Sequence, residues 1–306
     1  MSKKKLLIDC DPGHDDAIML LISCYQKKYD ILGVTSCSGN QTIEKTSLNA
    51  SNMLQFCGRN DIPISCGNST PMVRKPRICA EIHGESGLDG YNFPAYKHKY
   101  QKQPACDFII ENLLSNDKVT VITSGPMTNL GLAIQKNKEI ISHIDEIVLM
   151  GGSTGEGNIT KAAEFNILVD PEAADICFTS GAKLRMLGLN VTRQLLVYDE
   201  IVEAAKKIKT KGADLFAKLM EVFNKNQRDF FNIVAAPLHD PATIVALNNK
   251  RVFKFEKMKV TIDTSKTDEA GRTTCTPSSE WNTEVAVDCN PKLFFKEIFK
   301  YLKKCK

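Results

Sequence analysis

Residues 5–20 read KLLIDCDPGHDDAIML, and this stretch decides the fold because it joins a strand-like run to a helix-like run through a polar turn. Leu6–Asp9 is a short apolar run of the kind that forms a buried strand. An Asp/Pro/Gly turn follows it, and the apolar residues from Asp15 to Tyr29 recur with helical periodicity. The stretch therefore predicts a strand, a tight turn and a helix, which together begin a βαβ unit.

Strand-like and helix-like segments continue to alternate along the chain. Thr42–Cys57 has a helical pattern, and Gly58 follows it in the position that commonly ends a helix. The further strand candidates are Ile31–Cys37, Ile62–Cys66, Val119–Thr123, Glu146–Met150 and Lys183–Asn190. This alternation predicts an α/β fold in which an open, mostly parallel sheet is flanked by helices.

Three other parts of the chain depart from the alternation. Gly67 to Pro104 is a long loop rich in Gly, Pro, His and Tyr, and Asp199–Phe231 predicts more than one helix. A small antiparallel C-terminal extension is predicted from Phe253–Asp263, Gly271–Thr276 and Thr283–Asp288, and a final helix from Pro291–Lys304. No linker, low-complexity tract or internal repeat is evident, so we expect residues 1–306 to form a single domain.

The net charge of +4 is not evidence for a nucleic-acid partner. Lysines gather at the two chain ends, and without them acidic residues slightly outnumber basic ones. A nucleic-acid binder would instead carry its positive charge on the folded surface. No stretch approaches the roughly 20 apolar residues of a membrane span. We therefore expect neither a nucleic acid nor a membrane as partner.

The eleven cysteines include no C-x-x-C pair, so they predict neither a zinc site nor a disulfide framework. Free thiols in such number are typical of a reducing compartment. The apolar stretch near the N-terminus is too short for a signal peptide. The expected location is the cytoplasm.

Four aspartates lie within eight residues, at positions 9, 11, 15 and 16, and they would repel one another without a cation or protons between them. Asp9 and Asp11 would point to the same side of an extended segment, and Asp15 and Asp16 open the following helix. One of them could instead be an N-cap, with the others solvated. Oxygen ligands without Cys or clustered His favour Ca²⁺ or Mg²⁺.

Three later motifs also follow strand-like runs, where ligands bind in open parallel sheets. In Leu238-His239-Asp240-Pro241, Asp240 could be an N-cap with proline at N1, and His239 could be structural or catalytic. Glu164 and Asn166 flank an aromatic residue and could bind sugar hydroxyls or could merely decorate a turn. Ser124 could offer its backbone carbonyl to a metal, although a simple turn explains Ser124-Gly125-Pro126 equally well.

Taken together, the motifs resemble those of the inosine–uridine-preferring nucleoside hydrolase family. The matching segments are DCDPGHDDA at 9–17, GN at 39–40, HGESG at 83–87, VLMGG at 148–152, AEFN at 163–166, DPEAA at 170–174 and HDP at 239–241. They occur in the family's order and spacing from residue 6 to about 290. The resemblance implies a nucleoside hydrolase-like fold with a Rossmann-like core and a calcium ion at the strand ends.

The resemblance also implies a role for each matching residue. Carboxylates of Asp11, Asp16 and Asp240 and the main-chain carbonyl of Ser124, where the family often has Thr, would bind Ca²⁺. The implied substrate contacts are Asp15 and Asn166 with the ribose 2′ and 3′ hydroxyls, Asn40 nearby, and Asn158 and Glu164 with the 5′ hydroxyl. Family members are commonly dimers or tetramers, so the resemblance also implies a homodimer or homotetramer.

These roles lead us to expect calcium-dependent hydrolysis of the N-glycosidic bond of ribonucleosides, giving ribose and free base. The cation would lower the pKa of its bound water, and Asp11 would take the proton as general base. The transition state would have oxocarbenium character, and the configuration at the anomeric carbon would invert. His239, with His83 as a second contact, would assist the departing base.

The sequence leaves the preferred base open, and with it the choice between purine salvage and nucleoside catabolism. Broad-specificity relatives carry Tyr and Arg before the HDP motif, whereas residues 227–232 here read QRDFFN, and Arg228 could be displaced in function or merely solvated. His14 is expected to cap or pack. Two rivals to the hydrolase remain: an aspartate-nucleophile phosphatase, which also begins with D-x-D, and a non-catalytic ribose- or nucleoside-binding protein. The phosphatase would need a later Lys-bearing motif that is not evident, and the binding protein would not need Asp11.

Overall fold

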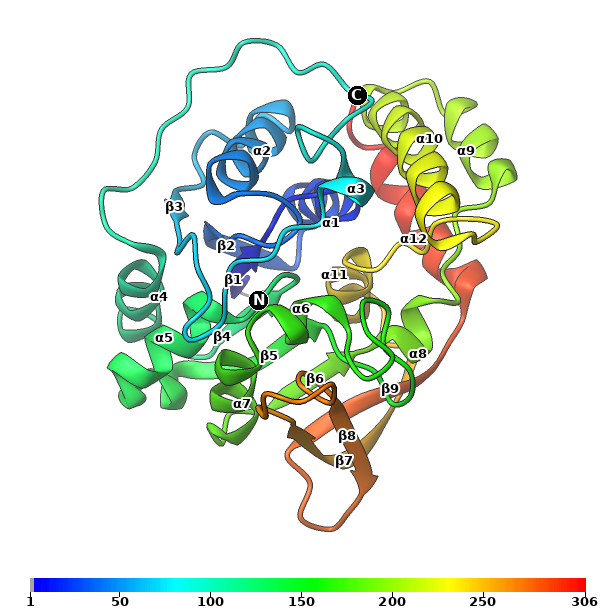
Figure 1. The fold of residues 1–306 in the computed structure, drawn as a ribbon. Helices are drawn as coiled ribbons and strands as arrows, with labels where there is room; N and C mark the ends of the chain where they lie inside the picture. Colours follow the sequence, from blue (N-terminus) through cyan, green and yellow to red (C-terminus); the bar gives the residue numbers. More distant parts are fainter. Residues whose placement is uncertain (1–2) are drawn as a thin grey trace.

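The computed structural model describes residues 3–306, whose strands form one mixed sheet. The strands are β1 (Lys4–Cys10), β2 (Tyr29–Ser36), β3 (Ile64–Cys66), β4 (Val119–Thr123), β5 (Ile144–Met150), β6 (Leu184–Leu187), β7 (Phe253–Ile262), β8 (Thr273–Pro277) and β9 (Thr283–Cys289). Their order across the sheet is β3-β2-β1-β4-β5-β6-β9-β7-β8 (Figure 1). Strands β1 to β6 pair in parallel, which confirms the predicted fold class.

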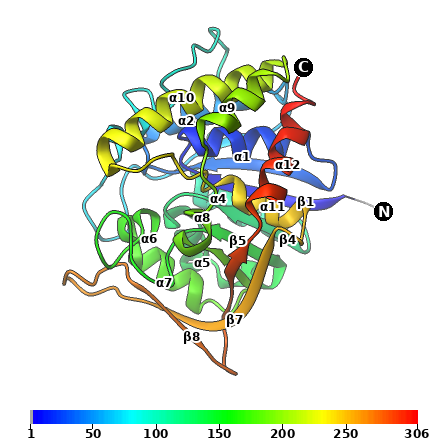
Figure 2. The same cartoon turned by 90° about the vertical axis from the view of Figure 1, so that its right-hand side faces the viewer.

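Helices cover both faces of this sheet (Figures 1 and 2). They are α1 (His14–Tyr25), α2 (Ile43–Phe56), α3 (Ala80–His83), α4 (Ala105–Leu114), α5 (Thr128–Lys136), α6 (Phe165–Val169), α7 (Pro171–Thr179), α8 (Leu189–Thr192), α9 (Asp199–Lys206), α10 (Lys211–Phe231), α11 (Pro241–Asn248) and α12 (Pro291–Leu302), with a 3₁₀ helix at Lys138–His143. Helices α1, α2, α10, α11 and α12 pack on one face, and α4, α5 and α7 pack on the other.

Strand β1 shows why the sequence forms this layered structure. Leu6 and Ile8 belong to the core beneath α1, whereas Leu7 belongs to the core beneath α5. All three side chains are fully buried. Because successive side chains of a strand point to opposite faces, a continuous apolar run suits a strand covered on both sides.

The C-terminal strands extend the main sheet. β9 runs parallel to β6 and antiparallel to β7, and β7 is antiparallel to β8. The strand predicted at Lys183–Asn190 ends at Leu187, because α8 begins at Leu189. The region from Asp199 to Phe231 forms two helices, α9 and α10, as predicted.

Within residues 3–306, no helix is both long and apolar enough to cross a bilayer. All eleven cysteines are free thiols, and six of them are buried or nearly so in the two cores.

Candidate active site

The polar turn after β1 carries Asp11 and leads directly into α1, whose first turn contains Asp15 and Asp16. Gly13 is the N-cap of α1, and its backbone N–H donates to Asp16 Oδ2 over 3.0 Å. A side chain at Gly13 would not fit, because a Cβ there would lie 2.4 Å from His83 Nδ1. The turn thus buries three carboxylates at the carboxyl edge of the parallel strands.

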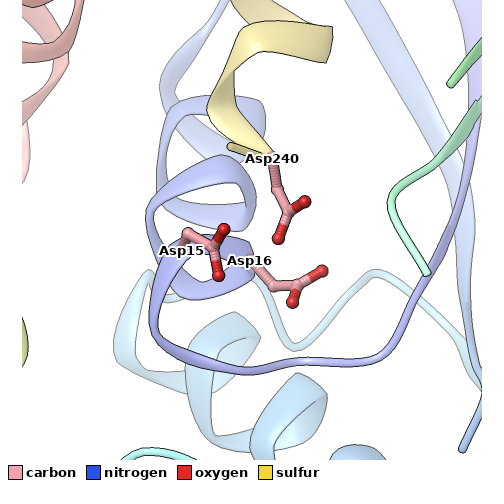
Figure 3. A group of neighbouring side chains, drawn as sticks. All are labelled: Asp15, Asp16 and Asp240. Carbon is pink, nitrogen blue, oxygen red and sulfur yellow. The ribbon is translucent and has the colours of Figure 1, made fainter. Parts of the chain in front are cut away.

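Asp240 brings a further carboxylate to the same place from the far end of the chain. One carboxylate oxygen from each of Asp15, Asp16 and Asp240 lies within 4.8 Å of the others, and all three side chains are buried. Figure 3 shows the Asp240 side chain descending from α11 toward the two aspartates of α1. Pro241 occupies the first turn of α11, but the Asp240 side chain makes no capping hydrogen bond. Asp240 thus occupies the N-cap position of α11, as the alternative has it, but its carboxylate is turned toward the other aspartates and does not cap the helix.

Asp11 lies beside this group without belonging to it. Its Oδ2 accepts the backbone N–H of Asn40 over 2.8 Å, and its Oδ1 is buried without a hydrogen-bond partner. Gly39 and Gly125 close the space around it, since a Cβ at either position would approach an Asp11 oxygen to 2.1 or 2.5 Å. A buried carboxylate oxygen without a partner is costly unless a cation or proton meets it.

Ser124, at the end of β4, connects the aspartates to the segment after β5. Its hydroxyl donates to Asp16 Oδ1 over 2.7 Å, and its carbonyl accepts from Asn166 Nδ2 over 2.8 Å. Asn40 Nδ2 donates to Asp16 Oδ2 over 3.0 Å. Asp16, Ser124 and Asn166 are therefore joined in one buried network.

The site has a strong excess of buried negative charge. Burial, followed by the charge of Asp16, raises the pKa of Asp15 to about 7. Burial and neighbouring carboxylates also raise the pKa values of Asp11 and Asp240 well above the ordinary range. Among residues 3–306, no Lys or Arg forms an ion pair with these aspartates. An all-oxygen donor set with an unsatisfied buried oxygen fits a hard divalent cation such as Ca²⁺.

Glu164 and Asn158 shape the wall beyond β5. Glu164 is the N-cap of α6: its Oε1 accepts from Asn166 N over 2.9 Å and its Oε2 from Gly152 N over 3.0 Å. Burial raises the pKa of Glu164 to about 7. Asn158 Oδ1 accepts from Phe165 N over 2.9 Å. Both side chains hold the backbone of the site and also line its cavity.

Two histidines face the same cavity from opposite elements. His239 Nδ1 lies 2.7 Å from Thr192 Oγ1, and burial followed by the charge of Arg193 lowers the pKa of His239 to about 3. His83, at the end of α3, stacks against Phe223 with ring centroids 5.4 Å apart. Burial lowers the pKa of His83 well below its usual value. Both imidazoles are therefore neutral in the free protein.

A cavity with about 530 Å³ of empty space, its open mouth included, unites these groups. Nine residues expected at the site line it: Asp15, Asn40, His83, Ser124, Asn158, Glu164, Asn166, His239 and Asp240. The other two, Asp11 and Asp16, are fully buried beside it.

Sequence reasoning missed most of the apolar lining and left residues 227–232 unassigned. Phe223, Gln227 and Phe231 of α10 all face the cavity, and their spacing of four places them on one helical face. That four-residue spacing is the sequence signal from which these lining residues could have been predicted. Arg228 points elsewhere and lies 3.6 Å from Asp199 at the surface, so the solvated alternative for Arg228 holds.

Comparison of this chain with known proteins agrees with the geometry of the site. Residues 6–296 match the family model described as inosine-uridine preferring nucleoside hydrolase. The pyrimidine-specific ribonucleoside hydrolase RihA of Photobacterium profundum is 41% identical over 297 residues, which cover 95% of this chain and 96% of the relative. RihA of Shewanella sp. (strain MR-4) is 43% identical over 263 residues, covering 85% of this chain and 83% of the relative.

Solved structures give the same result. The purine-preferring ribonucleoside hydrolase from Gardnerella vaginalis has a TM-score of 0.92 at 28% identity, with 99% of each chain covered. The plant nucleoside hydrolase PpNRh1 has a TM-score of 0.93 at 29% identity, also over 99% of each chain. The chain therefore belongs to the inosine-uridine preferring nucleoside hydrolase family and is an enzyme, a ribonucleoside hydrolase.

Proposed function

We propose that the enzyme hydrolyses the N-glycosidic bond of pyrimidine ribonucleosides, such as uridine and cytidine, in a calcium-dependent reaction. The observation that carries this proposal is the buried oxygen Asp11 Oδ1, which has no hydrogen-bond partner beside a cluster of three further carboxylates. Such a cluster needs a cation to balance its buried negative charge. The free oxygen of Asp11 can accept a proton during the reaction.

Asp11, Asp16, Asp240 and the Ser124 carbonyl are the residues that would hold the ion. Carboxylates and a backbone carbonyl are ligands that calcium prefers, and the remaining positions of its shell suit water and ribose hydroxyls. When bound, the ion would supply positive charge that lowers the pKa of a coordinated water.

Asp11 is assigned as the general base. Its Oδ2 is fixed by the Asn40 backbone, so Oδ1 is the oxygen left to take a proton from the attacking water. Asp15 and Asn166 are assigned to the ribose 2′ and 3′ hydroxyls, with Asn40 nearby. Asn158 and Glu164 are assigned to the 5′ hydroxyl. The carboxylate floor of the cavity favours the positive charge that develops on the ribosyl group, and a single displacement by water inverts the anomeric carbon.

His239 and His83 are assigned to the departing base. A neutral imidazole can donate one N–H hydrogen bond, and negative charge developing on the base raises its affinity for a second proton. The contact between His239 Nδ1 and Thr192 leaves Nε2 as the nitrogen available to the base.

Two observations support a pyrimidine base. The relatives that are 41% and 43% identical are named pyrimidine-specific. In addition, Gln227 places a neutral amide at the cavity, and an amide offers both donor and acceptor groups to the carbonyl and N–H edge of a pyrimidine. A purine-preferring relative in the structural comparison is only 28% identical.

Product analysis tests the proposal. The purified protein is incubated with uridine, cytidine, inosine and a phosphate monoester, with and without a calcium chelator, and ribose and phosphate are measured. We expect calcium-restored ribose release that is faster from uridine and cytidine than from inosine. Phosphate release would favour the phosphatase, and tight nucleoside binding without turnover would favour the binding protein.

The cellular location and the oligomeric state of the enzyme are also part of this proposal. We propose a cytoplasmic enzyme, because its eleven thiols are all free. We also propose a homodimer or homotetramer, by analogy with the family alone, and sedimentation of the purified protein tests this.

A further inference from the structure

His14 is fully buried at the first position of α1, although it contributes to none of the roles assigned above. Its ring belongs to a cluster of three rings, with centroids 5.2 Å from Phe223 and 5.5 Å from His83, and those two rings are 5.4 Å from each other. The planes of His14 and Phe223 are inclined by only 13°. A buried imidazole packed in such a cluster is held in one orientation by its ring contacts.

The hydrogen bonds of His14 fix which nitrogen carries its hydrogen. His14 Nε2 lies 2.9 Å from the backbone carbonyl of Asp89. A carbonyl only accepts, so Nε2 carries the hydrogen, and Nδ1 of the neutral ring offers a lone pair. The Asp89 carbonyl lies in a turn that its own carboxylate stabilises by accepting from the backbone N–H groups of Glu85 and Ser86, each over 3.0 Å.

Both polar contacts of residue 14 with His83 involve the same ring nitrogen of His83, Nδ1. The backbone N–H of His14 donates to His83 Nδ1 over 3.2 Å, and His14 Nδ1 lies 3.3 Å from the same atom. His83 Nε2 is therefore the nitrogen left for a ligand in the cavity that His83 lines. A backbone N–H is always a donor, so it favours the neutral form of His83 whose hydrogen is on Nε2, and the contact between the two Nδ1 atoms is then a packing contact and not a hydrogen bond.

Helix α10 completes the enclosure of this pair. Phe223 stacks on both imidazole rings, and Asn226 Nδ2 donates to the Ile82 carbonyl over 3.0 Å. His83 thus has a fixed position as well as a preferred tautomer. A donor held in place before the substrate binds costs less entropy to use than a mobile donor.

We propose that His14 is a positioning residue for the hydrolytic reaction, holding His83 by ring stacking and by its bond to Asp89 so that His83 Nε2–H points at the departing base. This proposal rests on the proposed function, because it takes His83 to be a contact of the leaving group. It adds a residue of the aspartate motif, between Gly13 and Asp15, that acts through His83 alone.

The test compares two substrates with the variant His14→Ala, which removes the ring contacts with His83 and Phe223 and the bond to Asp89 but keeps the backbone N–H. 4-Nitrophenyl riboside releases nitrophenolate, which needs no protonation, whereas uridine releases a poor leaving group. We expect kcat for uridine to fall about 10²-fold, with KM changed little, while kcat for the nitrophenyl riboside stays within about threefold of wild type. His98→Ala, which removes a histidine bonded to Ser51 and Gln55, is the matched control and should leave both rates unchanged.

Equal losses on both substrates, or no loss on either, would overturn the positioning role. If the wild-type enzyme cleaved neither substrate, the proposed function would fail instead, and the two failures are distinct. Nitrogen-15 NMR of the wild-type protein keeps the proposal open to refutation even if His14→Ala does not fold. We expect the His83 signals to report a protonated Nε2 and a bare Nδ1, and the opposite tautomer would contradict the proposal.

Discussion

The backbone N–H of Asn40 donates to Asp11 Oδ2 over 2.8 Å, while the other oxygen of the same carboxylate, Oδ1, is buried without a partner. One oxygen is thus held by the scaffold and the other is free to react. The loop that supplies Asn40 follows β2, which is the parallel neighbour of β1, so the pairing of two strands sets the orientation of the assigned base. This relationship makes Asp11 the most informative position for mutation.

Asp11→Asn should lower kcat for uridine by about 10²- to 10⁴-fold, the range that general bases contribute. The same change removes one buried negative charge from the cluster, so the metal-free variant should melt at or above the temperature of the metal-free wild type. Steady-state kinetics and thermal melting in chelator measure the two effects. Asp268→Asn, at an exposed loop position, is the control. A variant with near-normal turnover would remove Asp11 from its role.

Stability of the metal-free enzyme should depend on pH with a negative slope. Burial raises the pKa values of Asp15 and Glu164 to about 7, whereas both groups titrate near about 4 in an unfolded chain. The pKa values of Asp11 and Asp240 are raised as well, so between about pH 4 and 7 the carboxyl groups of the native state bind more protons than in the unfolded state and outweigh the opposite contribution of the buried His83 and His239; the free energy of unfolding therefore falls as pH rises.

Calcium should reverse this trend, because it binds the deprotonated carboxylates and binds only the folded cluster. Melting temperatures in chelator and in excess calcium chloride, measured from about pH 5 to pH 8, check both parts. The stabilisation by calcium should grow with pH. A constant increment at every pH, or a metal-free melting temperature that rises with pH, would contradict the charge assignment.

Much of the fold could be predicted because its signals are local. A run such as Leu6–Asp9 can only be buried on both faces, and the turn residues after it mark where the strand ends. The site residues could be predicted for a related reason: parallel strands place their carboxyl ends at one edge, so polar motifs after β1, β4 and β5 meet there.

The remaining features depend on tertiary contacts that local sequence does not encode. Asp240 before Pro241 has the same signature whether its carboxylate caps α11 or turns toward Asp16, and the structure has the second arrangement. Glu164 was predicted to bind a sugar hydroxyl, and its N-cap role was not foreseen because α6 is only one short turn after a glycine-rich loop. Which face of α10 meets the cavity likewise depends on how α10 packs against α1 and α3.

Gln227 and Arg228 offer a matched pair of adjacent residues for testing the base preference. Gln227→Leu should reduce kcat/KM for uridine by about 10-fold or more, because one amide pair across a buried contact contributes about 1–3 kcal/mol. Arg228→Leu should leave it unchanged, since Arg228 lies against Asp199 outside the cavity. Initial rates with uridine and inosine measure both variants. A larger effect at position 228 than at 227 would mean that α10 rotates when substrate binds.

Gly157 and Gly155 provide a similar comparison in the loop that carries Asn158. A Cβ at Gly157 would lie 2.0 Å from the Ala163 carbonyl oxygen, which is backbone and cannot move without displacing the loop, whereas a Cβ at Gly155 meets nothing within 4 Å. Gly157→Ala should therefore disturb the Asn158–Phe165 hydrogen bond of 2.9 Å and raise KM for uridine about 10-fold or more, since a misplaced contact to the 5′ hydroxyl weakens binding.

Gly155→Ala should bind uridine like the wild type, because neither space nor backbone conformation opposes it. 5′-Deoxyuridine makes the comparison specific. If Asn158 and Glu164 hold the 5′ hydroxyl, this substrate already lacks the contact, and Gly157→Ala should affect its KM much less than that of uridine. Equal effects of Gly157→Ala on the two substrates would show that the loop supports the site as a whole and does not bind the 5′ hydroxyl.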